Sequence, residues 1–102
     1  MRERISLDFH IKLDDRMFHF DISESLHSSI FSNSTRWSSF KQLRKIKDYY
    51  RTDCLFKGGD ALLFISEFIQ ICENNSLEER KIKEIKSLLS KNKISYIRVS
   101  GD

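Results

Sequence analysis

Apolar and polar residues alternate along the first part of the chain. From residue 5 to residue 13 the odd positions are all apolar, whereas the even positions are polar or charged. This period of two is typical of a β-strand that buries one face. After a polar turn at residues 14–16, the alternation resumes with apolar residues at positions 18, 20 and 22. The chain is therefore predicted to open with an amphipathic β-hairpin.

Two hairpin registers place all of these apolar residues on one face. If Asp14 and Asp15 form a two-residue loop, the numbers of paired residues sum to 29, and His10 faces His19. A shift of two residues, to a sum of 31, keeps the faces sorted equally well, because the side-chain period is two. Asp-Asp is not a strongly preferred turn pair. The sequence therefore leaves both registers open.

The next segment, residues 23–39, contains eight serines among a few large apolar residues. We expect a partly packed loop there, with a short helical or strand piece. A helix is then predicted to begin between Ser34 and Ser39, where Ser and Thr provide caps. Its apolar face is expected to carry Phe40, Leu43, either Ile46 or Lys47, and Tyr50.

The second half of the chain carries clearer signals. Residues 52–56 are consistent with a short strand, and Gly58-Gly59 with a turn in front of an apolar helix over residues 60–73, capped by Asp60. That helix is apolar around most of its circumference, including Leu62 and Leu63, so we expect it to pack on a sheet. Ser76–Glu79 matches a capping box and predicts the start of another helix, which Asn92 ends. Residues 94–99 are apolar on both faces, which indicates an internal strand.

These elements predict one α+β domain over residues 1–102. The expected order is ββ-α-(β)-α-α-β, with the hairpin and the last strand in one sheet packed by about three helices. The length of 102 residues suits one domain. No apolar run approaches the 18 residues of a membrane span, and Met1 leads into a strand pattern instead of a signal peptide. We therefore expect a cytoplasmic protein without a membrane partner, in which Cys54 and Cys72 are buried thiols.

The net charge of +3 is mild but unevenly distributed. Residues 1–33 carry four basic and six acidic side chains, whereas residues 34–57 carry seven basic and two acidic ones. The acidic half is a candidate surface for a basic partner. We assign to this partner-binding surface the polar residues of the hairpin and its flanks: Asp8, His10, Asp14, Asp15, His19, Asp21 and Glu24.

The polar face of the hairpin also contains the residue types of a metal site. In the sum-29 register, two histidines and two aspartates share one patch. Polar residues must occupy a solvated face in any case, so we expect a wet or partner-facing surface and predict no metal and no cofactor. One detail stays unexplained, because Asp8 directly opposite Asp21 costs stability. Either the register differs or a cation binds there.

The basic segment raises a different possibility, which is contact with nucleic acid. Cationic residues alternate there with aromatic residues, a combination found in single-strand binding. The candidate residues are Arg36, Lys41, Arg44, Lys45 and Arg51. Because Phe40 and Tyr50 fit the apolar face of a helix, we expect nucleic acid to be the less favoured partner.

No catalytic motif is present in the sequence. Gly58-Gly59-Asp60 lacks the spacing of a phosphate-binding loop, and the serines lack a nucleophile elbow. The apolar neighbours of Cys54 and Cys72 suit inert thiols. We therefore predict that the protein is not an enzyme.

The chain resembles the small immunity proteins of bacterial contact-dependent inhibition and related polymorphic toxin systems. The resemblance covers the full length and rests on a chain of 102 residues, the opening hairpin (residues 5–22), helices packed on a sheet, and a composition rich in Lys, Ile, Asn and Ser. It implies a protein that binds a cognate toxin domain, often a nuclease, and occludes its active site. A basic toxin would meet the acidic hairpin, whereas an acidic toxin would meet the basic segment. The alternative is a small nucleic-acid-binding or regulatory domain that uses residues 36–51. The oligomeric state is open, and we favour a monomer when the protein is free.

Overall fold

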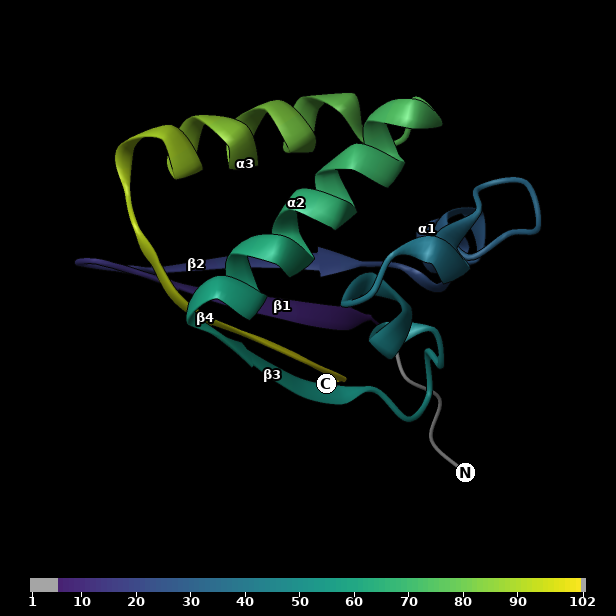
Figure 1. The fold of residues 1–102 in the computed structure, drawn as a ribbon, viewed down its shortest axis with the longest axis horizontal. Helices are drawn as coiled ribbons and strands as arrows, with labels where there is room; N and C mark the ends of the chain where they lie inside the picture. Colours follow the sequence, from purple (N-terminus) through teal and green to yellow (C-terminus); the bar gives the residue numbers. More distant parts are fainter. Residues whose placement is uncertain (1–5, 102) are drawn as a thin grey trace.

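A single antiparallel sheet with helices on one face organises the computed structural model, which describes residues 6–101 (Figure 1). Its strands lie in the order β2-β1-β4-β3. The strands are β1 (Leu7–Leu13), β2 (Met17–Ile22), β3 (Asp53–Lys57) and β4 (Ile94–Gly101). The helices are α1 (Glu24–Ile30), α2 (Gly58–Asn74) and α3 (Glu79–Lys91). The predicted α+β class and the order ββ-α-β-α-α-β are confirmed.

The hairpin adopts the register in which paired residue numbers sum to 29. Phe9 pairs with Phe20, and His10 pairs with His19. The turn is closed by the N–H of Leu13, which donates to the carbonyl of Arg16 at 2.8 Å. The alternative register is therefore excluded in this structure. The helix-facing residues of the hairpin are buried, except that Phe18 is partly exposed.

An aromatic cluster joins the sheet to the helices. The Phe9 ring lies 5.6 Å from the Phe20 ring, 5.5 Å from the Phe64 ring and 5.0 Å from the Phe68 ring. Phe56 of β3 stacks on Phe64 at 4.3 Å. These contacts bring β1, β2 and β3 against α2, and edge-to-face pairs of this kind add stability beyond the burial of apolar area.

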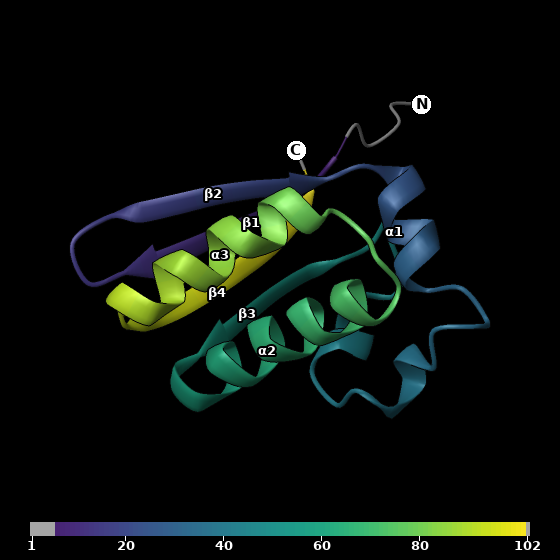
Figure 2. The same ribbon diagram turned by 90° about the horizontal axis from the view of Figure 1, so that it is seen from above.

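The two long helices lie side by side on the same face of the sheet (Figure 2). The final strand, β4, is paired on both sides, as predicted for an internal strand. Leu62 and Leu63 are 54% and 40% exposed, so their predicted burial is wrong. The sheet and α3 cover only part of the circumference of α2, and these two residues lie on the uncovered part.

Two predicted helix starts differ from the structure. α2 begins at Gly58, so Gly58-Gly59 belongs to the helix, and Asp60 lies in its first turn without being the cap. α3 begins at Glu79 after Glu78, whose φ of 48° is left-handed, and no side chain caps it. The capping box predicted at residues 76–79 is therefore wrong.

The α-helix predicted to begin between Ser34 and Ser39 and to include Tyr50 is also wrong. Two short 3₁₀ helices, Trp37–Ser39 and Leu43–Ile46, stand in its place. Leu43, Ile46 and Tyr49 are buried, whereas Tyr50 is exposed. This spacing of three residues matches the period of a 3₁₀ helix better than that of an α-helix.

A buried carboxylate on α2 holds this irregular segment in place. Oε1 of Glu67 accepts hydrogen bonds from the backbone N–H groups of Gln42 and Leu43, each at 2.9 Å. Both N–H groups belong to the start of the second 3₁₀ helix, where backbone donors have no partner within the helix. Glu67 therefore substitutes for the local hydrogen bonds that an α-helix would supply.

Replacing Glu67 tests this role. Glu67→Leu leaves two buried N–H groups without an acceptor and is expected to lower the free energy of unfolding by about 2–4 kcal/mol. Glu67→Gln keeps an acceptor oxygen and is expected to cost about 1 kcal/mol. Urea unfolding of the three chains measures the difference. Equal losses in the two variants would contradict the proposed role of the acceptor oxygen.

His27 is buried on α1 and donates its Nε2–H to the carbonyl of Ile46 at 2.8 Å. Its ring packs against Phe31 and Tyr49. Burial lowers the pKa of His27 below its usual value of 6.5, although the Ile46 carbonyl and the charges of Asp48 and Glu24 oppose the shift. The folded chain therefore favours the neutral imidazole.

The shift predicts a pH dependence of stability. The unfolded chain binds the proton of His27 more tightly than the folded chain does, so protonation of His27 favours unfolding. The free energy of unfolding is therefore unaffected by His27 protonation above a pH of about 6.5 and falls as the pH drops below that value. The decrease ends once the pH is below the folded pKa. His27→Gln keeps an N–H donor but does not titrate. Urea unfolding between about pH 5 and pH 8 is expected to show a steeper loss on acidification in the unmodified chain; parallel curves would refute the prediction.

Candidate functional site on the open face of the sheet

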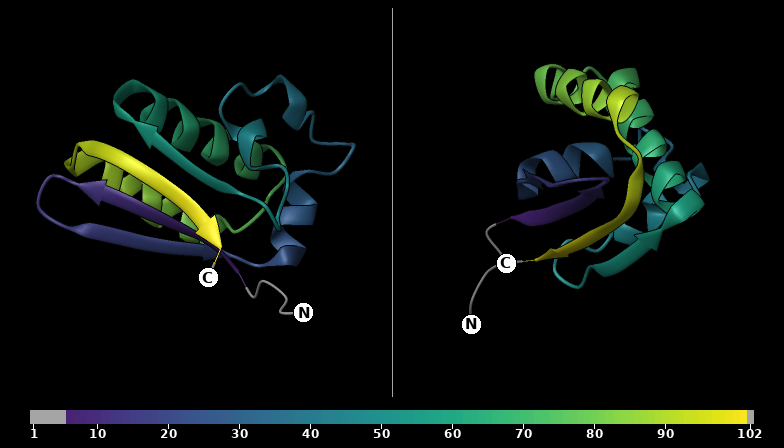
Figure 3. Two further views of the ribbon diagram at one scale, coloured as in Figure 1. Left: turned by 90° about the horizontal axis from the view of Figure 1, so that it is seen from below. Right: turned by 90° about the vertical axis from the view of Figure 1, so that its left-hand side faces the viewer.

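Within residues 6–101, no helix covers the second face of the sheet, which is turned toward the viewer in the left panel of Figure 3. Because side chains alternate along each strand, the even-numbered residues of β1 and their cross-strand partners project there. We call this surface the open face. It consists of Asp8, His10, Lys12, Met17, His19, Asp21, Asp53, Leu55, Lys57, Tyr96, Arg98 and Ser100.

The strand register sorts the open face into three rows across the sheet. The acidic row contains Asp21, Asp8, Ser100 and Asp53 in spatial order. The middle row contains His19, His10, Arg98 and Leu55, and the third row contains Met17, Lys12, Tyr96 and Lys57. The face is therefore negative along one margin and positive along the opposite one.

Among the described residues of the open face, two aspartates form ion pairs, Asp8 and Asp53. The Asp8 side chain is only 14% exposed, whereas that of Asp53 is 64% exposed. Its Oδ1 accepts a hydrogen bond from the Ser6 hydroxyl at 3.1 Å and lies 3.6 Å from Nε2 of His19. Asp21 pairs with Asp8 across the hairpin. Two carboxylates of like charge thus lie opposite each other, as the sum-29 register predicts.

The two histidines of the middle row lie close together. The imidazole ring centres of His10 and His19 are 4.7 Å apart. One ligand atom from each of Asp8, His10 and His19 lies within 4.8 Å of the others. Among residues 6–101, this is the one group of three or more His, Cys, Asp or Glu side chains close enough to hold a metal ion.

The β3 side of the open face has a different character. Arg98 donates from Nη2 to Oδ1 of Asp53 at 3.0 Å. Beside this pair is a shallow hollow of about 380 Å³, lined mainly by Leu55, Lys57, Tyr96 and Arg98. Leu55 is 48% exposed, so apolar surface is available next to the charged rows.

The predicted partner-binding residues do not all lie on one surface. Asp8, His10, His19 and Asp21 share the open face, whereas three others lie outside it: Asp14, Asp15 and Glu24. Glu24 begins α1 and accepts a hydrogen bond from the Tyr50 hydroxyl.

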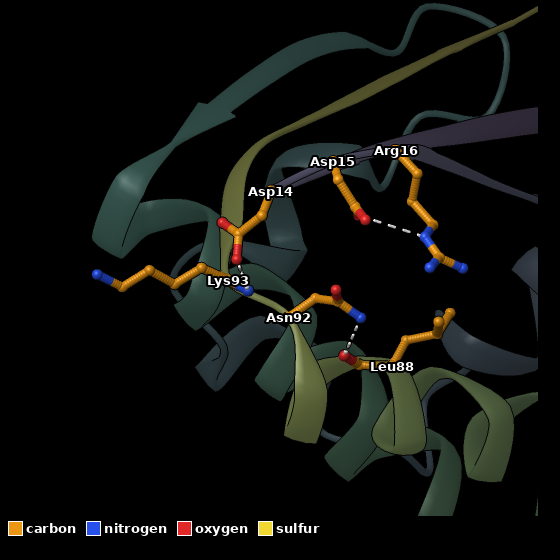
Figure 4. A network of polar contacts seen from close by, with 6 residues as sticks. All are labelled: Asp14, Asp15, Arg16, Leu88, Asn92 and Lys93. Carbon is orange, nitrogen blue, oxygen red and sulfur yellow. Dashed lines mark hydrogen bonds and ion pairs between the residues drawn. The ribbon is translucent and has the colours of Figure 1, made fainter.

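The other two acidic residues belong to the hairpin turn, and Figure 4 shows their contacts. Oδ2 of Asp14 accepts from the backbone N–H of Lys93 at 3.2 Å, and Asp15 pairs with Arg16 at 3.4 Å. Asp14 thereby ties the turn to the start of β4. The turn and Glu24 lie at opposite ends of the hairpin.

The basic candidates for nucleic-acid contact are all exposed. They are Arg36, Lys41, Arg44, Lys45 and Arg51. Within the described part of the chain, none of them forms an ion pair. Lys45 instead lies 6.0 Å from the centre of the Phe56 ring. Since the segment is not an α-helix, these cations do not form the regular basic face that the sequence suggested.

The two cysteines are free thiols. Burial raises the pKa of the Cys72 thiol to about 12, and burial also raises the pKa of Cys54. Cys72 is fully buried, as predicted, whereas Cys54 is only partly buried. Thiols with raised pKa values are weak nucleophiles at neutral pH because the thiolate is scarce.

Several open-face residues lie outside the predicted site, notably Asp53, Leu55, Tyr96 and Arg98. The last strand was expected in the same sheet as the hairpin, but the placement of these residues depends on the strand order and on the pairing registers of β4 with β1 and of β3 with β4, which local patterns do not reveal. The weak signal that was available is the alternation of residues 53–57, in which Phe56 is buried and its neighbours are exposed.

Comparison of the chain with protein families, curated proteins and solved structures gives no match. Among the described residues, no helix has both the length and the apolar character needed to cross a bilayer.

The Asp8–Asp21 pair predicts that removing one charge stabilises the protein. Asp21→Asn is expected to raise the free energy of unfolding by about 0.2–1 kcal/mol, because like charges directly opposite each other are destabilising. The matched control Asp53→Asn removes a charge from the same row but breaks the pair with Arg98, so no gain is expected. Denaturant unfolding in the presence of a chelator tests both; a loss of stability in Asp21→Asn would contradict the prediction.

Proposed function

We propose that this protein is an immunity protein that binds a cognate bacterial toxin domain, with the open face as its main contact surface. The observation that supports this most is that one face of the sheet bears helices while the other presents charged, imidazole and apolar side chains. Such a mixture of exposed apolar area and ordered charge suits protein recognition.

The charge pattern indicates the kind of partner. The acidic row contains three aspartates, and Glu24 lies beyond the same end of the hairpin. A toxin domain with a basic active-site surface, as a nuclease has, complements this margin. Leu55 in the middle row and Met17 in the third row supply exposed apolar contacts elsewhere on the open face. Occlusion of the toxin's active site by the acidic row is the proposed mechanism of inhibition.

The open face alone is smaller than a typical protein–protein interface, so the contact surface is expected to extend beyond it. A typical interface uses about 20–30 residues on each side, and the open face has 12. Glu24 at one end, or Asp14 and Asp15 at the other, would extend it. The proposal places the complex in the cytoplasm of the cell that produces the immunity protein.

A binding and protection assay tests the proposal. The gene next to that of this chain is searched for a toxin domain; a domain found there is purified, and its affinity for the chain and its residual activity are measured. Asp21→Lys is expected to weaken binding about tenfold or more, with a steeper effect at low salt. Arg44→Glu, a charge reversal on the basic segment, is the matched control and is expected to change affinity less than about twofold.

Each outcome of this assay has a defined meaning. Absence of binding and of protection would overturn the proposed function. A loss of binding in Arg44→Glu but not in Asp21→Lys would transfer the contact to the basic segment and overturn the role of the open face. Both variants must first be shown to retain the melting behaviour of the unmodified chain.

A further inference from the structure

We propose that Asp8, His10 and His19 form a binding site for a divalent transition-metal ion of the zinc class on the open face. This site does not depend on the proposed function, because all three ligands come from one hairpin. Two imidazoles and one carboxylate are ligands that zinc commonly takes in proteins. The sequence contains the residue types of a metal site on this face but led us to predict no metal, and the geometry of the folded hairpin is what now supports one.

The backbone already places the ligands close to a binding arrangement. His10 and His19 are directly opposite each other on paired strands, and Asp8 is two residues from His10 on the same face. Ligands in a tetrahedral zinc site lie about 3.4 Å from one another, from bond lengths of about 2.1 Å. The ligand atoms here lie within 4.8 Å of one another, and Nε2 of His19 is 3.6 Å from Oδ1 of Asp8. Movements of about 1 Å close the site, and the His19 side chain, 52% exposed, has room for them.

One ligand is held by a neighbouring group. The Ser6 hydroxyl donates to Oδ1 of Asp8 at 3.1 Å, and Ser6 is itself buried. Hydrogen bonds of this type orient a carboxylate ligand and are a regular feature of metal sites. The Asp8 carboxylate is thus held in place on β1, an internal strand of the sheet.

The electrostatics also favour a cation at this position. The sequence offered two explanations for Asp8 opposite Asp21: a different hairpin register or a bound cation. Since the structure has the sum-29 register, the bound cation is the explanation that is left. Arg98 pairs with His10 on the neighbouring strand β4, but its guanidinium group donates a hydrogen bond to Asp53 on β3. A divalent ion between Asp8 and the histidines would offset the repulsion within the acidic pair.

The site is open on its outer side. Three protein ligands leave at least one coordination position, and the open face directs that position away from the core. We therefore infer an exposed ion that carries water when the protein is free. We propose that the site binds the ion, and we assign it no reaction.

Titration of the full-length chain, without an affinity tag, tests the site. Isothermal titration calorimetry with zinc chloride is expected to give one ion per chain, and the melting temperature is expected to rise with zinc concentration. Magnesium is the control ion, because it prefers oxygen ligands and should neither bind nor stabilise. In NMR spectra, zinc is expected to shift the ring signals of His10 and His19, while those of buried His27 stay unchanged.

Variants separate a ligand from a nearby charge. His10→Gln, His19→Gln and Asp8→Asn are each expected to weaken zinc binding at least tenfold. Asp21→Asn is the matched control, since it removes the same charge directly across the hairpin from Asp8, and it is expected to change affinity less than about threefold. The circular dichroism spectrum of each variant shows whether it is folded.

The result that overturns the site is equally defined. Zinc that produces no heat and no melting shift up to millimolar concentration refutes it. Equal losses in Asp8→Asn and Asp21→Asn, or equal binding of magnesium, would indicate diffuse attraction to the acidic row and would also refute it. Because the toxin domain is absent from these measurements, a negative result leaves the outcome of the toxin-binding assay unaffected.

Discussion

The pairing of β1 with both of its neighbours is the constraint on which the rest of the structure depends. β1 has strands on both sides, and Phe9 reaches from it to aromatic rings on β2 and α2. A slip of one residue would turn Asp8, His10 and Lys12 into the core and expose its apolar residues, which is energetically prohibitive. The register that buries the apolar face therefore also fixes the opposite face. The histidine pair and the aspartate pair are consequences of packing on the other side of the sheet.

A second long-range interaction explains how an irregular segment is held on a regular scaffold. Residues 31–52 contain no α-helix or strand, only two short 3₁₀ helices and turns. Glu67 reaches this segment from α2 and accepts two of its backbone donors, and His27 reaches it from α1 and donates to Ile46. The two side chains supply polar partners that the segment lacks locally. The exposed Lys and Arg side chains of residues 31–52 therefore project from a backbone that these hydrogen bonds hold in place.

The open face supports two separate proposals that rest on different atoms. Recognition of a basic toxin domain draws on the acidic row and on exposed apolar side chains at the two edge strands. Metal binding draws on one carboxylate and two imidazoles within the hairpin. Asp8 belongs to both arrangements, so a bound cation would reduce the negative charge offered to a basic partner. The charge of this surface would then depend on whether the ion is bound.

The sequence predicted those features whose cause lies in local periodicity. Alternation located the hairpin and sorted its faces, and the apolar pattern located the last strand and the two long helices. Asp8, His10, His19 and Asp21 could be placed on one face because both registers that sort the apolar residues keep these four on the same side of the hairpin. The helix starts were less well predicted, since the glycine pair and the Ser76–Glu79 motif allow several local conformations of similar energy.

Only the tertiary structure decided what depends on contacts between distant residues. The choice of the sum-29 register, the pairing of Arg98 on β4 with His10, and the position of β3 at the edge, with Asp53 and Leu55 beside β4, follow from long-range pairing. Residues 40–50 carry an apolar pattern compatible with an α-helix, yet Glu67 captures their backbone donors in a 3₁₀ geometry. The sequence alone therefore determined which side chains of the hairpin share a face. The fold determined which of them meet, because strand order and buried hydrogen bonds join positions that no local pattern relates.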